Sequence, residues 1–170
     1  LFVSISMRWK SQSVTRGGTA AVSATTWGGA PRTTASCAGS NAGDNTVGQI
    51  PNTYVTAVTK ANISTWRMTG TNAYSGATVL YGGGTLILDY SSSDTGKFSD
   101  TTALTLGGAT LGGTLTLKGG SHTEVVSATT LSAGGAFLAR SSGGTAKLRM
   151  NAIARAAGGT INLGDDSIAD

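Results

Sequence analysis

The stretch Gly84-TLILDY-Ser91 decides the fold, because a short phrase of this kind returns several times along the chain. Its relatives are Ala103-LTLGG-Ala109, Gly113-TLTLKGG-Ser121 and Gly159-TINL-Gly164. Apolar side chains alternate with polar ones in each copy, which is typical of a β-strand with one buried face. The glycines that follow favour tight corners, where a positive φ or a close backbone approach is needed. The repeat therefore indicates a stack of short strands that turn corners.

Similar strands are expected throughout residues 63–170. They lie within 65–70, 76–81, 85–90, 103–108, 114–119, 123–131, 136–141, 146–153 and 159–164. Repeats of roughly 20 to 30 residues that consist only of strands predict a β-solenoid, an all-β fold. Alternate leucines, such as Leu86 and Leu115, would point inward. A short helix over 146–157 is the alternative for that segment, because Gly158 could cap it.

The chain divides into two segments with different patterns. At 170 residues it is long enough for one domain with a hydrophobic core. We expect the β-solenoid over residues 63–170. We expect an irregular β/loop segment over 1–62, rich in Gly, Ser and Thr, which serves as a cap or as an inter-subunit contact. Charged residues make up only 12%, against about 25% in an average domain. A glycine-rich, charge-poor chain with many hydroxyl groups suits an extracellular protein.

The charge distribution argues against a nucleic-acid partner. The formal net charge is +4, and the excess of basic residues lies before residue 68. These side chains are scattered among Ser, Thr and Gly, whereas a nucleic-acid interface needs a basic stripe with stacking aromatic residues. Weak attraction to a polysaccharide or to an anionic cell-surface polymer fits better. No run of about 20 apolar residues predicts a transmembrane segment.

The single cysteine and the single histidine, Cys37 and His122, limit the chemistry of the chain. Their number excludes an intrachain disulfide and the usual zinc sites. We expect Cys37 to be an inert thiol, and a covalent bridge between subunits is the alternative outside the cell. We expect no cofactor and no metal. Calcium bound by the acidic residues of the solenoid is the alternative.

The order of motifs in the second segment resembles a known repeat. Residues 72–88 read NAYSGATVLYGGGTLIL, and DTGKFSDTTALTLGGATL follows from residue 94. TLKGGSHTEVVSATTLSAGG and RMNAIARAAGGTINLG continue the pattern. This order is similar to the autotransporter-associated β-strand repeat of large bacterial surface proteins, over about residues 65–170. The resemblance implies a right-handed parallel β-helix that is exported and non-enzymatic.

The leading functional hypothesis is a bacterial extracellular or cell-surface structural protein. Each end of a solenoid is a row of unpaired strand edges that invites another chain. We therefore expect the protein to assemble with copies of itself, into a filament or a layer, through the solenoid ends and the N-terminal segment. Aromatic residues would anchor this inter-subunit contact. They are Trp9, Trp27, Tyr54 and Trp66.

The alternative hypotheses are a carbohydrate-binding or polysaccharide-cleaving β-helix, or a fragment of an adhesin stalk. Glu124 follows His122 by two positions, so both would lie on one strand face and could form a carboxylate–imidazole pair. Basic residues near this pair would be Arg140 and Arg149. The neighbouring Asp165 and Asp166 would point in different directions, so they do not supply the paired carboxylates of a glycosidase. We therefore expect no enzymatic activity.

Overall fold

The computed structural model describes residues 21–25, 34–38, 44–50, 57–108 and 110–170. This part of the chain contains β-strands and no helix, so the fold is all-β. The alternative prediction of a short helix over 146–157 is therefore wrong. The strands before residue 100 are β1 (Ala21–Thr25), β2 (Thr34–Ala38), β3 (Asp44–Val47), β4 (Ala57–Lys60), β5 (Thr65–Met68), β6 (Thr78–Leu80) and β7 (Thr85–Asp89). The later strands are β8 (Ala103–Leu106), β9 (Thr114–Lys118), β10 (Thr123–Val125), β11 (Ala128–Leu131), β12 (Gly134–Ser141), β13 (Lys147–Arg149), β14 (Ala152–Arg155) and β15 (Gly159–Leu163).

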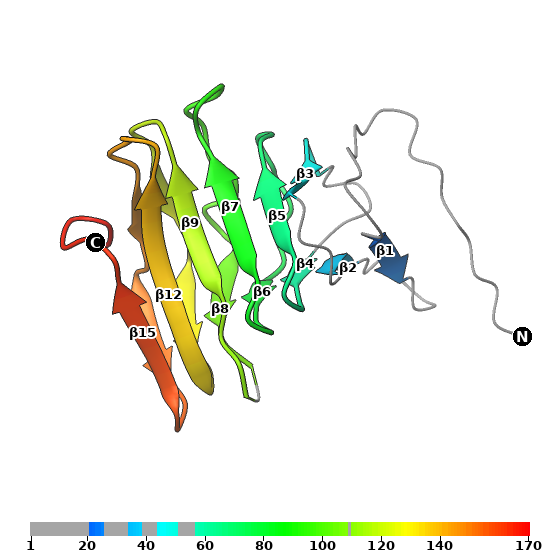
Figure 1. Ribbon diagram of the computed structural model, residues 1–170, viewed down its shortest axis with the longest axis vertical. Coiled ribbons are helices and arrows are strands. Elements are labelled where there is room, and N and C mark those ends of the chain that lie inside the picture. Colours follow the sequence, from blue (N-terminus) through cyan, green and yellow to red (C-terminus); the bar gives the residue numbers. More distant parts are fainter. Residues whose placement is uncertain (1–20, 26–33, 39–43, 51–56, 109) are drawn as a thin grey trace, which may run out of the picture.

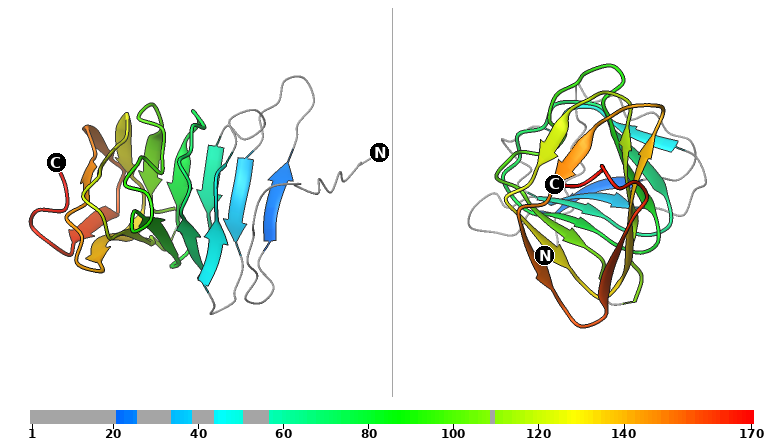
Figure 2. Two further views of the ribbon diagram at one scale, coloured as in Figure 1. Left: turned by 90° about the horizontal axis from the view of Figure 1, so that it is seen from above. Right: turned by 90° about the vertical axis from the view of Figure 1, so that its left-hand side faces the viewer.

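These strands stack into a parallel β-solenoid, as the repeat predicts (Figure 1). A seven-stranded sheet has the order β1-β2-β4-β6-β8-β11-β14, and a six-stranded sheet has the order β15-β12-β9-β7-β5-β3. β10 and β13 form a small sheet on a third side. The pairings between these strands are parallel, except that β1 runs antiparallel to β2. Figure 2 shows the stack from the side and along its axis, with the chain winding around a closed interior.

The register of the strands stacks inward side chains into columns, and these core columns form the hydrophobic interior. We call each turn of the chain a rung. One core column of the six-stranded sheet contains Trp66, Leu86, Leu115, Leu138 and Leu163. One core column of the seven-stranded sheet contains Val58, Thr78, Leu104, Thr129 and Ile153. In both columns the side chains are buried except in the last rung.

Two of the expected strands are each broken by a corner. The stretch 123–131 contains both β10 and β11, and 146–153 contains both β13 and β14. Asn151 forms the second corner with a φ of 51°, a left-handed conformation that asparagine tolerates better than most residues. Because no glycine marks either corner, the sequence pattern did not reveal them.

The solenoid begins before the boundary predicted at residue 63. β2 pairs in parallel with β4, and β3 pairs in parallel with β5. The predicted division at 62/63 is therefore wrong for these strands, which already form rungs. Polar residues in their inward positions hid the alternation. Asn45 is one of them, since it is buried and its Nδ2 donates a hydrogen bond of 2.9 Å to the carbonyl oxygen of Thr65.

A substitution at Gly112 tests how closely the corners of neighbouring rungs approach each other. A Cβ atom at this position would overlap the carbonyl oxygen of Gly135, whereas a Cβ atom at Gly48 meets nothing within 4 Å. Gly112→Ala is expected to lower the free energy of unfolding by about 2–4 kcal/mol, because one rung must shift against the next. Gly48→Ala is the matched control, with an expected change within about 0.5 kcal/mol. Urea unfolding followed by circular dichroism measures both, and equal losses would contradict the close approach.

Candidate functional site

The structure separates the four residues of the predicted carbohydrate site. A Cβ atom built on Gly96 would lie 3.6 Å from Glu124 Oε1 and 3.7 Å from His122 Nε2, so those two side chains do lie close together. Glu124 is nevertheless fully buried, in the middle of β10. Arg149 is exposed, one position further along the neighbouring strand β13. Arg140 is held in a different network at the end of the chain.

Glu124 binds the loop that connects β7 to β8. Its Oε2 accepts hydrogen bonds from the Tyr90 hydroxyl at 2.6 Å and from the backbone N–H of Lys97 at 2.7 Å. Its Oε1 accepts a hydrogen bond of 2.9 Å from the backbone N–H of Phe98. In this rung the third side of the solenoid is formed by the loop and not by a strand, so the N–H groups of the loop have no strand partner. The Glu124 carboxylate accepts their hydrogen bonds instead.

The surroundings of Glu124 form a closed ionisable cluster. Burial raises the pKa of Glu124, although the three donors oppose this shift by stabilising the charged form. The Lys97 ammonium lies 5.1 Å from the centre of the Tyr90 ring, and it donates to the carbonyl oxygen of Ser93. The His122 ring centre lies 5.4 Å from that of Tyr90. Because its carboxylate is enclosed and engaged, Glu124 orders the loop.

Asp94, in the middle of the same loop, fastens it to the next rung. Its Oδ1 accepts hydrogen bonds from the backbone N–H groups of Ser121 at 3.0 Å and His122 at 2.8 Å. Its Oδ2 accepts a bond of 2.8 Å from the Ser121 hydroxyl. These bonds hold the pKa of Asp94 below its ordinary value. Since both carboxylate oxygens cap a corner of the next rung, the role of this residue is structural.

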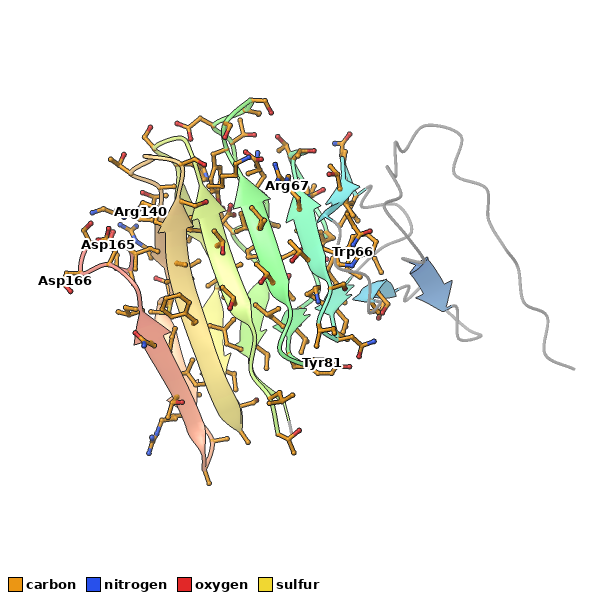
Figure 3. The ribbon with its side chains drawn as sticks, viewed as in Figure 1. Trp66, Arg67, Tyr81, Arg140, Asp165 and Asp166 are labelled. Atoms are coloured by element: carbon orange, nitrogen blue, oxygen red, sulfur yellow. The ribbon has the colours of Figure 1, made fainter. Side chains whose placement is uncertain are left out.

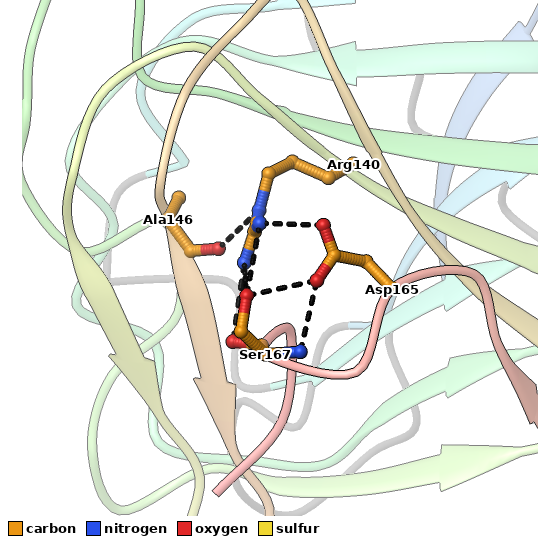
Figure 4. A network of polar contacts seen from close by, with 4 residues as sticks. All are labelled: Arg140, Ala146, Asp165 and Ser167. Atoms are coloured by element: carbon orange, nitrogen blue, oxygen red, sulfur yellow. Dashed lines mark hydrogen bonds and ion pairs between the residues drawn. The ribbon is translucent and has the colours of Figure 1, made fainter.

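Arg140 holds the last residues of the chain (Figure 4). Its Nη1 donates to Asp165 Oδ2 at 2.8 Å, and its Nη2 donates to the carbonyl oxygen of Ser167 at 3.1 Å. Its Nε donates to the carbonyl oxygen of Ala146 at 3.1 Å. Figure 3 shows Arg140 and Asp165 together at the C-terminal end of the solenoid. The guanidinium group is thus engaged within the chain, and Arg140, Arg149 and Glu124 do not share one ligand site.

A glutamine at position 124 tests this structural role. Glu124→Gln offers one acceptor oxygen, so the N–H of Lys97 or of Phe98 loses its acceptor. We expect the free energy of unfolding to fall by about 1–3 kcal/mol at neutral pH. Tyr90→Phe, which leaves both N–H bonds in place, should cost less.

The same variant tests the raised pKa. The folded protein holds the Glu124 proton more tightly than the unfolded chain does, so the free energy of unfolding should fall as the pH rises above about 4.5. This contribution should be missing in Glu124→Gln. Urea titrations between about pH 4 and pH 8 measure both effects, and a variant as stable as the wild type would contradict the role assigned to Glu124.

Of the aromatic residues predicted for the inter-subunit contact, the structure describes Trp66. Trp66 is fully buried in a core column, and its Nε1 donates to the Ser64 hydroxyl at 3.1 Å (Figure 3). Its predicted role as a contact residue is therefore wrong, because neighbouring rungs cover the indole ring. Trp9, Trp27 and Tyr54 lie outside the residues that the structure describes.

Cys37 and Lys60 lie side by side in another core column. Cys37 is only 1% exposed, and burial raises the pKa of its thiol to about 12. Burial lowers the pKa of Lys60 to about 8, while its Nζ donates to the carbonyl oxygens of Ala61 at 2.8 Å and Asn62 at 2.7 Å. Lys60 thus satisfies carbonyl groups at a corner. Cys37 is an inert thiol, and its enclosure is incompatible with a disulfide between folded subunits.

The feature that points to a function is the open C-terminal rung, which consists of β14, β15 and residues 168–170. Ile153 and Leu163 occupy core-column positions, yet they are 55% and 42% exposed. β14 and β15 are the last strands of their sheets, so among the described residues nothing pairs with their outer edges. Apolar side chains and unpaired backbone groups therefore meet at the same surface.

The third side of this rung is closed differently. Ile168 is fully buried, and its carbonyl oxygen accepts a hydrogen bond of 2.8 Å from the N–H of Leu148. The N–H of Met150 donates to the carbonyl oxygen of Asp170 at 3.1 Å. Residues 168–170 thus lie against β13 as a further strand would, and they complete the rung.

Sequence reasoning predicted contact at the solenoid ends but did not single out Ile153 and Leu163, which are exposed at the C-terminal end. The signal was the register, because Ile153 stands at the level of Thr129, and Leu163 at the level of Leu138. Among the described residues, β14 and β15 are the outermost strands, so no described rung covers their inward apolar positions. The prediction named large aromatic residues instead, and one of them, Trp66, is buried in the core.

Comparison with known proteins identifies no relative: no family model, curated protein or solved structure matches the chain. Within the described ranges, no helix has the length and apolar character needed to cross a membrane. The same residues contain no group of three or more His, Cys, Asp or Glu side chains placed to hold a metal ion. Function is therefore inferred from the geometry of the chain itself.

Proposed function

We propose that this chain is a non-enzymatic structural module of an exported bacterial surface or extracellular protein, which assembles with copies of itself through its solenoid ends. The observation that carries the proposal is the open C-terminal rung. Ile153 and Leu163 continue buried core columns but face solvent. A further rung stacked on them would remove their apolar surface from water and would pair the edges of β14 and β15.

The rest of the molecule supports a structural role. The low charge content and the abundance of Ser, Thr and Gly suit an extracellular protein, and the motif order resembles repeats of bacterial surface proteins. The ionisable groups with shifted pKa values are engaged in structure, as Glu124 binds a loop and Lys60 a corner. These two residues support rung stacking, because both of them satisfy backbone groups where the chain leaves a strand.

Charge placed on the open C-terminal rung tests the proposal. The double variant Ile153→Lys with Leu163→Lys should weaken self-association by about 100-fold or more, because two apolar anchors become charges at a contact that must exclude water. Sedimentation velocity over a range of concentrations measures this, and electron microscopy shows whether filaments or layers form.

The matched control carries the same changes at exposed apolar residues away from the end. Ile63 and Leu111 are 65% and 58% exposed, and the double variant Ile63→Lys with Leu111→Lys should associate like the wild type. A wild-type protein that stays monomeric at 16.9 kDa at every concentration would refute assembly by this chain. Equal losses in both double variants would refute the role of the end.

A second candidate function is binding of a neutral polysaccharide, and a shallow hollow favours it. The hollow has a volume of about 200 Å³, and its lining contains no charged side chain. Phe137, 39% exposed, stands beside Thr114 of the neighbouring strand. An aromatic ring next to hydroxyl groups is a surface on which a sugar ring can stack. The other lining residues are Gly83, Thr110, Leu111, Gly112, Gly113 and Gly135.

Affinity electrophoresis in gels that contain neutral polysaccharides tests this candidate. Phe137→Ala should reduce any retardation of the protein by about tenfold in apparent affinity, because the stacking surface is lost. Ile63→Ala, which removes an exposed apolar side chain outside the hollow, should have no effect. If no neutral polysaccharide retards the wild type, this candidate fails.

A further inference from the structure

We infer that the sugar site around Phe137 extends along the solenoid axis and binds a linear chain of neutral sugars, with one sugar unit for each rung. This inference rests on the proposed polysaccharide binding, and it names the form of the ligand and its direction on the surface. The observation that carries it is a column of outward side chains on the six-stranded sheet. We call it the outer column, and its members are Thr65, Thr85, Thr114 and Phe137.

The outer column presents one side chain to solvent from each of four neighbouring strands, β5, β7, β9 and β12 (Figure 1). The three threonines are half-buried, and Phe137 is 39% exposed. Neighbouring strands lie about 4.8 Å apart, which is close to the length of one ring in an extended sugar chain. A chain laid along the axis therefore meets one member of the column with each unit.

The hydroxyl groups of the column are available to a ligand. Within the described residues, neither the Thr85 nor the Thr114 hydroxyl has a hydrogen-bond partner. Other threonines of the chain use this group within the fold, as Thr102 does when its hydroxyl donates to the carbonyl oxygen of Tyr74 at 3.1 Å. A threonine hydroxyl both donates and accepts, so it matches the hydroxyl groups of a neutral sugar.

The neighbours of Phe137 set the direction of the chain. Along β12, its outward neighbours are Gly135 and Ala139, whose side chains offer no hydrogen bond. Along the axis, its neighbours are Thr114 on one side and Asn162 on the other. A sugar chain with one ring stacked on Phe137 therefore gains hydrogen bonds from side chains when it continues along the axis, and not when it follows the strand.

The hollow and the charges beside the column favour a neutral ligand. Thr114 and Phe137 also line the hollow, whose lining contains no charged side chain. In the next outward column, Arg67 forms an ion pair of 3.1 Å with Asp89. The same carboxylate binds Lys118 at 3.0 Å. An acidic sugar would therefore meet cations that are already paired.

Oligosaccharides of increasing length test the extent of the site. The probes are linear β-1,4-glucose, β-1,4-mannose and β-1,3-glucose oligosaccharides of one to six units, and isothermal titration calorimetry measures their affinity. For the series that binds, we expect the affinity to rise at least tenfold between two and four units. It should then level off, because four units fill the outer column.

A valine at position 85 tests the column two strands away from the aromatic ring. Thr85→Val removes the hydroxyl and keeps a β-branched side chain, so the strand should be preserved. Binding of the four-unit oligosaccharide should weaken by about threefold to tenfold, whereas binding of two units should not change. Thr105→Val is the matched control, because Thr105 is a half-buried outward residue of β8 on the other large sheet. It should have no effect.

The outcomes separate this inference from the candidate function on which it rests. Binding that depends on Phe137 but levels off at one or two units would overturn the extended site and leave sugar binding at the hollow standing. Unchanged affinity of the four-unit oligosaccharide in Thr85→Val would do the same. If no oligosaccharide binds, the inference fails, and if no polysaccharide retards the protein either, both fail.

Discussion

Parallel stacking of rungs in register is the constraint on which the rest of this structure depends. Strands lie about 4.8 Å apart, so every inward side chain stands directly above its counterpart in the previous rung. Shape must then agree along a column, and leucines do so from Leu86 through Leu115 to Leu138. The same spacing limits the corners. A side chain at Gly112 would strike the backbone of the next rung. The glycines and the leucines of the repeat are thus both explained by one constraint. Successive turns of the chain must lie as close together as paired strands.

Places where the chain leaves a strand raise a second requirement, because backbone groups at corners and loops lose their partners. The protein meets it with polar side chains that reach into the interior. Lys60 donates to the carbonyl oxygens of Ala61 and Asn62, and Glu124 accepts from the N–H groups of Lys97 and Phe98. A sequence-based search finds such residues first as candidates for chemistry, since acids and lysines are the usual catalytic groups. Because Lys60 and Glu124 are buried and bonded to backbone groups, their roles are structural.

Most strands after residue 63 could be predicted because most of their inward positions are apolar and many of their corners carry glycine. β3 could not be predicted as a rung, since Asn45 fills an inward position that elsewhere holds an apolar residue. In β2 the inward residues are only the small Ala35 and Cys37, which give a weak alternation. The corners within 123–131 and 146–153 escaped notice because no glycine marks them. Trp66 was predicted as a contact residue because it is aromatic and lies beside the N-terminal segment, although the register pairs it with Leu86 in a core column. Of the candidate site, the general location at a solenoid end could be predicted. The residues Ile153 and Leu163 required the register, which depends on where each corner falls.

The composition of the last rung bears directly on how its end is used. A rung that faces water permanently would be expected to carry polar residues at its inward positions, as the terminal units of repeat proteins do. Arg155 fits that expectation, since it follows Leu131 in its column, is exposed, and donates to the carbonyl oxygen of Gly159 at 3.4 Å. Ile153 and Leu163 do not fit it, and their sheets also end in strands without an outer partner. Leaving both apolar columns and both strand edges in water costs free energy, which a covering rung recovers. The proposed self-association would meet both requirements with one contact, because a covering rung removes the apolar side chains from water and pairs the strand edges.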